Sequence, residues 1–306
     1  MFTHLALFET AYPESRSGGG SYTEWGGVAA ESFASGEGTQ SSPYVIENAA
    51  QLKLFADKIA QNQHRTDFFR LGADIYYNDV SAWETWDEST SPAYPWTPIG
   101  DADGPFCGGF DGAGHTIYGL YAVGEKDVAM FGMAKFITLV GLTIDKSYFC
   151  GNEFVAAFVG RAKVSSDLYH CVNRAKVICK GKGVAAFIGG GKRKESTPGT
   201  REHHAETTGE HFTILNCKNY SDIVGVSYVG GMVGYINSGR CRAQIVGCEN
   251  FGKIIASEKA AVSVVSACQC LRRASARRLG EARLDRFAER NAAQLDWSQR
   301  GCLNAL

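Results

Sequence analysis

Short apolar runs with alternating polarity fill the middle of the chain and predict β-strands. In the segments 222–226 and 229–233, apolar residues alternate with polar or small ones, and glycine, asparagine or serine separates one run from the next. A period of two residues with such punctuation is typical of strands. Another short strand is expected at about 44–46.

A different pattern between residues 48 and 61 predicts one α-helix. The i, i+3, i+4, i+7 spacing of a single apolar face is followed by Leu52, Phe55, Ala56 and Ile59. We expect this helix to cover one end of the β-structure, because an uncovered sheet end invites aggregation.

The apolar runs recur along the chain. FVAAFVGRAK starts at Phe154, GVAAFIGGGK at Gly183 and YVGGMVGYIN at Tyr228. The first two copies lie 29 residues apart and the next two 45 apart. The extra length falls in a polar insertion at 191–211, and tolerance of an insertion is typical of a surface loop.

A cysteine followed two positions later by an asparagine accompanies the repeat. The cysteines are Cys171, Cys217 and Cys248, and the asparagines are Asn173, Asn219 and Asn250. If the repeats stack, the cysteines form an internal column and the asparagines a hydrogen-bonded ladder in a turn. We expect packed, unpaired thiols here. Disulfides or a metal site are the alternatives, and they are disfavoured because stacked side chains point the same way and not at each other. An earlier copy has Leu142 at the cysteine position and aligns Cys150 with Cys179.

A unit of about 30 residues made of short strands cannot bury its apolar face alone, whereas stacked units can. The sequence therefore predicts an all-β fold, a parallel β-helix or solenoid. Its corners are expected at glycines, because a coil must turn there between strands: Gly160, Gly189, Gly230 and Gly234.

Composition and charge exclude several classes of protein. Of 306 residues, 36 are glycine and 7 are proline, which fits neither collagen nor a Pro/Gly-rich linker. The 31 Lys and Arg balance 32 Asp and Glu, so neither a nucleic acid nor an anionic membrane is expected as a partner. No apolar run reaches the roughly 18 residues of a spanning helix, and the first residues do not form a signal peptide. We therefore expect no membrane insertion, and find no signal peptide or anchor in this chain.

The ordered motifs GTQSSPYVIENAAQL, LGADI, WTPIG, GGFDGAGHTIYGL and AMFG, followed by VAAFVG, VAAFIG and VGGMVG, resemble the GLUG-repeat proteins. The resemblance covers about residues 36–260. These proteins are bacterial and mostly extracellular, and related segments occur beside immunoglobulin A peptidase domains and in large surface adhesins. The resemblance implies a right-handed parallel β-helix and an extracellular or cell-surface location. It implies no particular activity, since a fold does not fix a function.

Three regions follow from these patterns: a poorly ordered leader at 1–40, the GLUG-type β-helix at 41–265, and an unrelated tail at 266–306. The tail holds eight Arg and no Lys, Val, Ile, Thr or Tyr, so we expect a helical or disordered segment. A frame shift of two bases can turn AVSVVSA at 261–267 into Gly-Ile-Gly-Gly-Ile-Gly, close to the repeat. The tail is therefore interpreted as a frameshift product.

Candidates for chemistry are few, and no cofactor is expected. His203, His204 and His211 in the polar insertion are candidate metal ligands, but their irregular spacing and the lack of a cysteine or carboxylate partner in a defined motif favour an exposed loop. Carboxylates for glycoside hydrolysis are another candidate set, although turns and strand ends also explain them: Asp74, Asp79, Asp101, Asp103 and Asp111. We assign none of these residues a catalytic or metal-binding role.

The aromatic residues at 83–96 suggest binding. Trp96 belongs to the WTPIG motif and is expected in the core, which leaves Trp83 and Trp86 as candidate surface rings that could stack on sugars. Packing against the fold is the favoured alternative for both rings. The predicted function is a noncatalytic surface module that binds a host or microbial glycan or a surface protein. The alternatives are a carbohydrate-active enzyme, either a glycosidase or a lyase, and a non-functional fragment of a larger surface protein.

Overall fold

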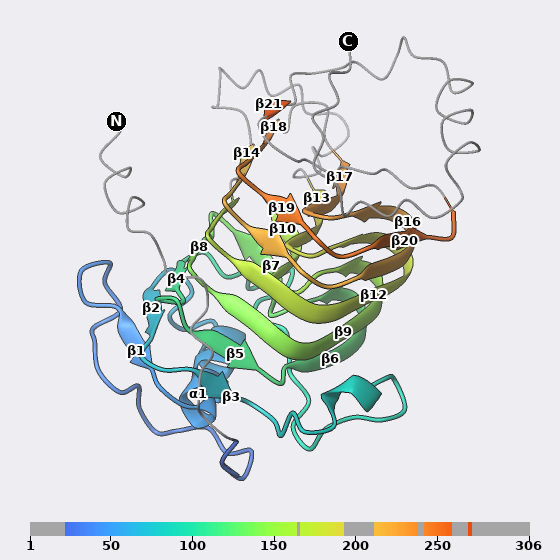
Figure 1. Ribbon diagram of the computed structural model, residues 1–306. Helices are drawn as coiled ribbons and strands as arrows, with labels where there is room; N and C mark the ends of the chain where they lie inside the picture. Colours follow the sequence, from blue (N-terminus) through green and yellow to red (C-terminus); the bar gives the residue numbers. More distant parts are fainter. Residues whose placement is uncertain (1–21, 164–165, 193–210, 238–241, 259–268, 271–306) are drawn as a thin grey trace, which may run out of the picture.

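The computed structural model describes residues 22–163, 166–192, 211–237, 242–258 and 269–270. In this part of the chain nearly all regular structure is β-strand, arranged in three sheets, with one α-helix (Figure 1). The predicted all-β class is confirmed. No helix among these residues combines the length and the apolar character needed to cross a bilayer.

Sheet 1 runs the length of the molecule and is parallel except at its last strand. Its strands, in spatial order, are β1 (Tyr44–Ile46), β2 (Phe68–Leu71), β4 (Gly109–Asp111), β8 (Thr138–Val140), β11 (Ser166–Tyr169), β14 (His211–Leu215), β18 (Arg242–Val246) and β21 (Gln269–Cys270). β21 pairs antiparallel with β18. The predicted strand at 44–46 is therefore present. Part of the predicted helical or disordered tail is instead a strand, and its other residues lie outside the described part.

Sheets 2 and 3 are parallel throughout. Sheet 2 contains β3 (Ile75–Tyr76), β5 (Thr116–Tyr118), β6 (Tyr121–Val128), β9 (Thr143–Val155), β12 (Val172–Ala185), β15 (Lys218–Asn219), β16 (Ile223–Gly230), β19 (Glu249–Asn250) and β20 (Ile254–Ala256). Sheet 3 contains β7 (Phe131–Lys135), β10 (Val159–Lys163), β13 (Ile188–Lys192) and β17 (Val233–Asn237).

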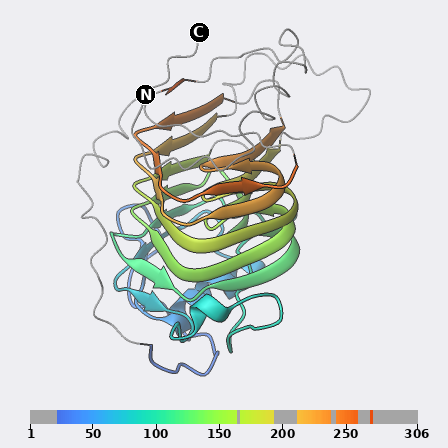
Figure 2. The same cartoon turned by 45° about the vertical axis from the view of Figure 1, so that its right-hand side comes forward.

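Successive segments of the chain visit the three sheets in the same order. We number four of them: segment 1 (138–163), segment 2 (166–192), segment 3 (211–237) and segment 4 (242–256). Segments 1 to 3 each place a strand in sheet 1, then sheet 2, then sheet 3, and segment 4 repeats the first two steps. Figure 2 shows these segments as layers stacked on one another. Equivalent residues are in register, as in the row Val155, Val184 and Val229.

One strand boundary differs from the sequence prediction. The chain stays extended from Ile223 to Gly230, and the second predicted strand, 229–233, spans the corner between β16 and β17. The apolar side chains on both sides of this corner, Val229 and Met232, point into the same core. Apolar alternation therefore continues across a corner, which is why it does not reveal one.

Helix α1 (Ala49–Ala60) agrees with the predicted helix to within one residue at each end. The Asn48 side chain accepts a hydrogen bond from the Gln51 amide at 3.0 Å, which satisfies one free donor of the first turn. The Phe55 ring lies 4.1 Å from the ring of Phe69 and 5.5 Å from that of Phe106. The helix thus packs its apolar face against the core at the end of the stack that includes β1 and β3 (Figure 1).

The expected leader is partly wrong. Residues 1–21 lie outside the described part, but residues 22–40 pack on the molecule. The Trp25 indole donates to the carbonyl of Tyr77 at 2.9 Å, and Ser35 pairs with Val45. A half-buried aromatic anchor and a backbone bridge hold this segment in place.

Two columns of residues with positive φ make the corners. One column precedes the cysteine row: Gly141, His170, Asn216 and Gly247. The other lies within the long strands of sheet 2, one or two residues before their ends: Asp127, Phe154, Gly183 and Tyr228. Most non-glycine residues avoid this conformation, so the strands on either side must hold it. The sequence alone does not mark these corners, because glycine occupies fewer than half of them.

The glycines expected at corners lie elsewhere. Gly160, Gly189 and Gly234 lie inside β10, β13 and β17, and Gly230 ends β16. A Cβ atom on Gly189 would approach the backbone carbon of Phe154 to 2.7 Å. These strand glycines are therefore required by close backbone approach, not by a turn.

The close approach predicts that Gly189→Ala destabilises the fold by about 2 kcal/mol, because a backbone contact cannot relax as a side chain can. Gly124→Ala is the matched control, since its nearest neighbour is a Val128 methyl group at 3.4 Å. Urea unfolding measures both changes. Equal free energies of unfolding for the two variants would contradict this explanation.

Candidate functional site

The asparagine side chains of β12, β15 and β19 form a row, buried at Asn173 and Asn219 and partly exposed at Asn250. Asn173 donates to the side-chain oxygen of Asn219 at 2.8 Å, and Asn219 donates to that of Asn250 at 2.6 Å. Each also binds its own turn, as Asn219 does by donating to the carbonyl of Ser221 at 2.8 Å. Asn173 and Asn219 are fully buried, so these bonds satisfy polar groups that water cannot reach.

The cysteine row lies beside the asparagines and is fully packed. Cys171, Cys217 and Cys248 are unpaired thiols, each at most 2% exposed. The amide of Cys171 donates to the sulfur of Cys217 at 3.4 Å, and the amide of Cys217 to that of Cys248 at the same distance. Burial raises the pKa of the Cys217 thiol, which keeps it protonated and unreactive. Both rows are structural and leave no surface for a ligand.

Cys150 and Cys179 do not lie in one row. Cys150 pairs with Ile178, and Cys179 pairs with Gly151. Their side chains therefore point to opposite faces of sheet 2, Cys179 into the main core and Cys150 to the outside. The register differs by one residue from the alignment expected from the sequence. Because side chains alternate along a strand, an offset of one residue moves a side chain to the other face.

An apolar stripe runs along the outer face of sheet 2. Its members are paired in register from strand to strand and comprise Val123, Cys150, Ile178, Val224 and Ile255. The two ends of the stripe, Val123 and Ile255, are each 45% exposed, whereas Cys150 in between is 1% exposed. Another segment of the chain therefore covers part of this face.

The cover is a segment that we call the strap, residues 80–88, which includes a short 3₁₀ helix at Trp83–Thr85. The Trp86 ring meets the Tyr121 ring edge to face at 6.0 Å, and the Tyr121 hydroxyl donates to the carbonyl of Asp87 at 2.7 Å. The Lys176 ammonium donates to the carbonyl of Glu84 and lies 5.0 Å from the centre of the Trp83 ring. The strap is therefore fixed to the sheet by aromatic packing and by lysines from β12.

Of the two interpretations of Trp86, a surface ring for sugar binding is wrong and the favoured one, packing, is confirmed. Trp86 is 5% exposed and packs with Tyr121, Tyr148 and Cys150 in a small cluster outside the main core. Trp83 is half-buried under Lys176. Burial removes Trp86 as a stacking platform, a lysine occupies the Trp83 ring, and Trp96 is in the core as expected.

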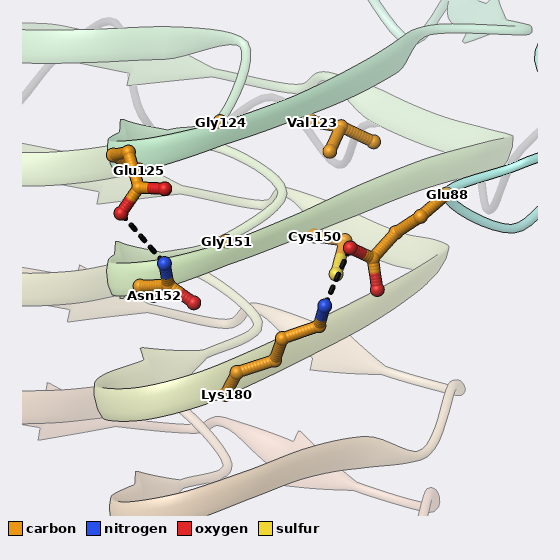
Figure 3. Close-up of a pocket in the computed structure, with 8 residues that line it drawn as sticks. All are labelled: Glu88, Val123, Gly124, Glu125, Cys150, Gly151, Asn152 and Lys180. Carbon is orange, nitrogen blue, oxygen red and sulfur yellow. Dashed lines mark hydrogen bonds and ion pairs between the residues drawn. The ribbon is translucent and has the colours of Figure 1, made fainter.

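A groove of about 200 Å³ opens between the strap and the outer face of sheet 2. Its lining comes from the strap and from β6, β9 and β12 (Figure 3): Glu88, Val123, Gly124, Glu125, Cys150, Gly151, Asn152 and Lys180. Glu88 and Lys180 face each other at one end, and Glu125 and Asn152 at the other (Figure 3).

The polar side chains of the groove contact each other in two pairs. The Lys180 ammonium lies 2.5 Å from a carboxylate oxygen of Glu88, and this contact raises the pKa of the lysine. The Asn152 amide donates to Glu125 at 2.6 Å. Burial raises the pKa of the Cys150 thiol, so it is a neutral part of the wall. The groove thus offers carboxylate acceptors, an ammonium donor and a carboxamide with both functions.

Asp79, Asp101 and Asp111 serve local turns, whereas Asp74 binds a residue of a neighbouring strand. Asp74 accepts from the Thr116 amide at 2.9 Å, Asp79 from that of Ser81 at 2.9 Å, Asp101 from those of Asp103 and Gly104, and Asp111 from that of Ala113 at 2.8 Å. The acidic side chains in the groove are glutamates that the sequence did not single out. Nothing in the sequence distinguishes these glutamates, because exposed glutamates are common on protein surfaces.

Metal and histidine candidates receive no support from the geometry. His203 and His204 lie outside the described residues, as does the side chain of His211 at the start of β14. Across the described ranges, His, Cys, Asp and Glu side chains nowhere gather in threes with the geometry to hold a metal ion.

The far end of the outer face carries a second, more exposed surface. The rings of Tyr220 and Phe251 stack at 4.8 Å with an angle of 12° between them, and the Arg174 guanidinium lies 4.2 Å from the centre of the Tyr220 ring. Phe251 is 58% exposed. Tyr220 thus lies between Arg174 and Phe251, and Phe251 ends the row of stacked groups within the described residues.

Comparison with known proteins gives local sequence likeness. No model of a known protein family matches the chain. It is 34% identical over 105 residues to a "Putative Gly-rich membrane protein" of Evansella cellulosilytica, covering 33% of this chain and 10% of that protein. It is 35% identical over 116 residues to halomucin of Haloquadratum walsbyi, covering 36% of this chain and 1% of halomucin. The chain spans a tenth or less of the length of these relatives.

Among solved structures, the chain is similar to a "putative immunoglobulin A1 protease" from Bacteroides ovatus. The likeness covers 78% of this chain and 83% of that chain, at 16% sequence identity and a TM-score of 0.43.

The asparagine row predicts that Asn219→Ala lowers the free energy of unfolding by about 3 kcal/mol, because it removes the bonds to both ladder neighbours and one of them, Asn173, is fully buried. Asn250→Ala should cost about 1 kcal/mol, since it removes the bond to one ladder neighbour and Asn250 is partly exposed. Urea unfolding gives both values. A smaller loss of unfolding free energy for Asn219→Ala than for Asn250→Ala would disprove the idea that each asparagine stabilises its ladder neighbours.

The strap contacts predict that Trp86→Ala loosens residues 80–88. Loss of a buried aromatic ring costs about 3 kcal/mol, so limited proteolysis within the strap should accelerate by tenfold or more. Trp83→Ala, at a half-buried site, should accelerate cleavage less. Unchanged cleavage in the Trp86→Ala protein would show that the strap is held by other contacts.

Proposed function

We propose that this protein is a noncatalytic extracellular or cell-surface module that binds a glycan in the groove beside the strap. One observation carries the proposal. Two carboxylates, a carboxamide and an ammonium group line one groove of about 200 Å³. Glu88 belongs to the strap, and the other three groups belong to the paired strands β6, β9 and β12. Sugar hydroxyls donate to carboxylates and accept from ammonium and amide groups, so this set suits a polyhydroxylated ligand.

The proposed scaffold is a right-handed parallel β-helix of the GLUG-repeat type, with α1 covering one end. The repeated order of sheets 1, 2 and 3 supports it, as does the in-register stacking of segments 1 to 4. In such a scaffold the outer side chains of successive segments occupy fixed rows. A groove built on these rows needs little reorganisation to bind a ligand, and preorganisation favours affinity.

An extracellular or cell-surface location is part of the proposal. The resemblance to GLUG-repeat proteins supports it, and one relative is named a membrane protein. The proposed partner is a host or microbial glycan, and a surface protein is the alternative partner.

A carbohydrate-active enzyme is the second candidate, and the groove itself is what favours it. Glu88 and Glu125 lie in one groove, and paired carboxylates are the usual machinery of glycoside hydrolysis. However, each is already engaged, Glu88 by Lys180 and Glu125 by Asn152. Such pairing suits binding better than proton transfer to a leaving group.

Binding to a panel of polysaccharides, measured by calorimetry, tests the proposal. For a polysaccharide that binds, Lys180→Ala and Asn152→Ala should each weaken affinity about tenfold, equivalent to about 1.4 kcal/mol. Lys182→Ala is the matched control, because Lys182 pairs with Glu153 at 3.2 Å and does not line the groove. Absence of binding, or equal losses for Lys180→Ala and Lys182→Ala, would overturn the groove as the site.

The same panel separates binding from catalysis. A noncatalytic module leaves the polysaccharides unchanged after prolonged incubation. New reducing or unsaturated ends that disappear in the Glu88→Gln or Glu125→Gln variant would replace the binding proposal with the enzyme.

A further inference from the structure

Strand β20 is the outermost strand of sheet 2 at the end of the stack opposite α1 (Figure 1). It pairs with β16 through Ile223 and Ile254, Val224 and Ile255, and Gly225 and Ala256. In the part of the chain that the structure describes, no strand pairs with its other side. An edge of this kind is a template for another strand.

The backbone groups that face this free edge can be identified. The Lys253 carbonyl accepts from the Ile223 amide at 2.8 Å, and the Ser257 amide donates to the Gly225 carbonyl at 3.1 Å, so both residues bond toward β16. Alternate residues of a parallel strand bond to opposite sides. The N–H and C=O groups of Ile254 and Ala256 therefore point to the free edge.

The side chains on this edge add an apolar contact surface. Ile255 is 45% exposed and Phe251 is 58% exposed. Both belong to segment 4, at the end of the stack, beyond the reach of the strap contacts described above. Burying them would add hydrophobic stabilisation to backbone pairing.

The same end of the stack already accepts an antiparallel strand in sheet 1. There, β21 pairs antiparallel with β18, the segment 4 strand equivalent in position to β20. An antiparallel partner is thus compatible with the twist and spacing of segment 4.

We propose that β20 pairs antiparallel with β20 of a second copy of this chain, with the two-fold axis passing beside Ile255. In this register Ile254 lies opposite the partner's Ala256, and both present N–H and C=O groups to the shared edge. Each pair exchanges two hydrogen bonds, as in a closely spaced antiparallel pair. The two Ile255 side chains then meet on the outer face, at the non-hydrogen-bonded position.

Charge also fits this self-pairing. In the same register Lys253 lies opposite the partner's uncharged Ser257, so no like charges lie directly opposite each other between residues 253 and 257. The contact is self-complementary, as a two-fold interface requires. It extends sheet 2 across two molecules and leaves both grooves open.

Sedimentation equilibrium of the full chain tests the proposal. The wild-type protein should be a dimer that dissociates on dilution. Ala256→Pro removes an edge N–H without touching the bonds to β16, and Ile255→Lys places like charges at the axis, so both variants should shift the dimer dissociation constant upward at least about tenfold. Val123→Lys is the control: it has the same 45% exposure at the other end of the stripe and should remain dimeric.

A cross-link fixes the register. Ile255→Cys should form a disulfide between two copies under mild oxidation, because directly opposite residues at a non-hydrogen-bonded position lie close enough. Peptide mapping should find residue 255 joined to residue 255. A protein that stays monomeric at all concentrations, or a dimer that persists in both Ala256→Pro and Ile255→Lys, would overturn this proposal. Either result leaves the proposed glycan binding to its own test.

Discussion

In-register stacking of parallel strands is the constraint on which the rest of this molecule depends. Val155, Val184 and Val229 occupy one row although unequal stretches of chain separate them. Each segment must therefore turn at the same places, whatever residue stands there. His170 and Asn216 take the positive φ that glycine takes at the equivalent Gly141 and Gly247. Packing of neighbouring layers outweighs the local preference of these residues.

Stacking also explains why a polar row survives in the interior. A single buried asparagine would leave donors and acceptors unsatisfied, whereas a row of them satisfies each member from the one beside it. The row starts at Asn173, which lies opposite Ile144 in segment 1. Its amide can reach its own turn and the next asparagine, so an apolar neighbour on the other side costs little. The cysteine row beside it supplies small side chains that fit between the layers.

Much of this interior could be predicted from the sequence, because inward positions repeat. The CxN motif identified both rows, and the apolar period identified α1 and β1. Predictions failed where neighbouring layers decide the outcome. Gly189 was assigned to a corner but lies in a strand against the backbone of Phe154, and β16 continues through a position where the pattern suggested a break.

The outer face could not be predicted, for a related reason. Trp86 is buried because a strap from residues 80–88 folds over strands that lie more than 30 residues away in the sequence, and no local pattern encodes that contact. Packing of the strap on sheet 2 also forms the groove, because it brings Glu88 of the strap next to Lys180 of β12. Side chains at outward positions acquire a role through register and through the strap, not through their own sequence context.

The stacked register itself can be tested in solution. Nuclear Overhauser effects between backbone protons of β12, β16 and β20 measure it most directly, through the row Val177, Ile223 and Ile254. Parallel stacking predicts contacts between these residues, 46 and 31 positions apart, in the pattern of parallel strands. Contacts that instead join neighbouring runs of the sequence as antiparallel hairpins would contradict the account.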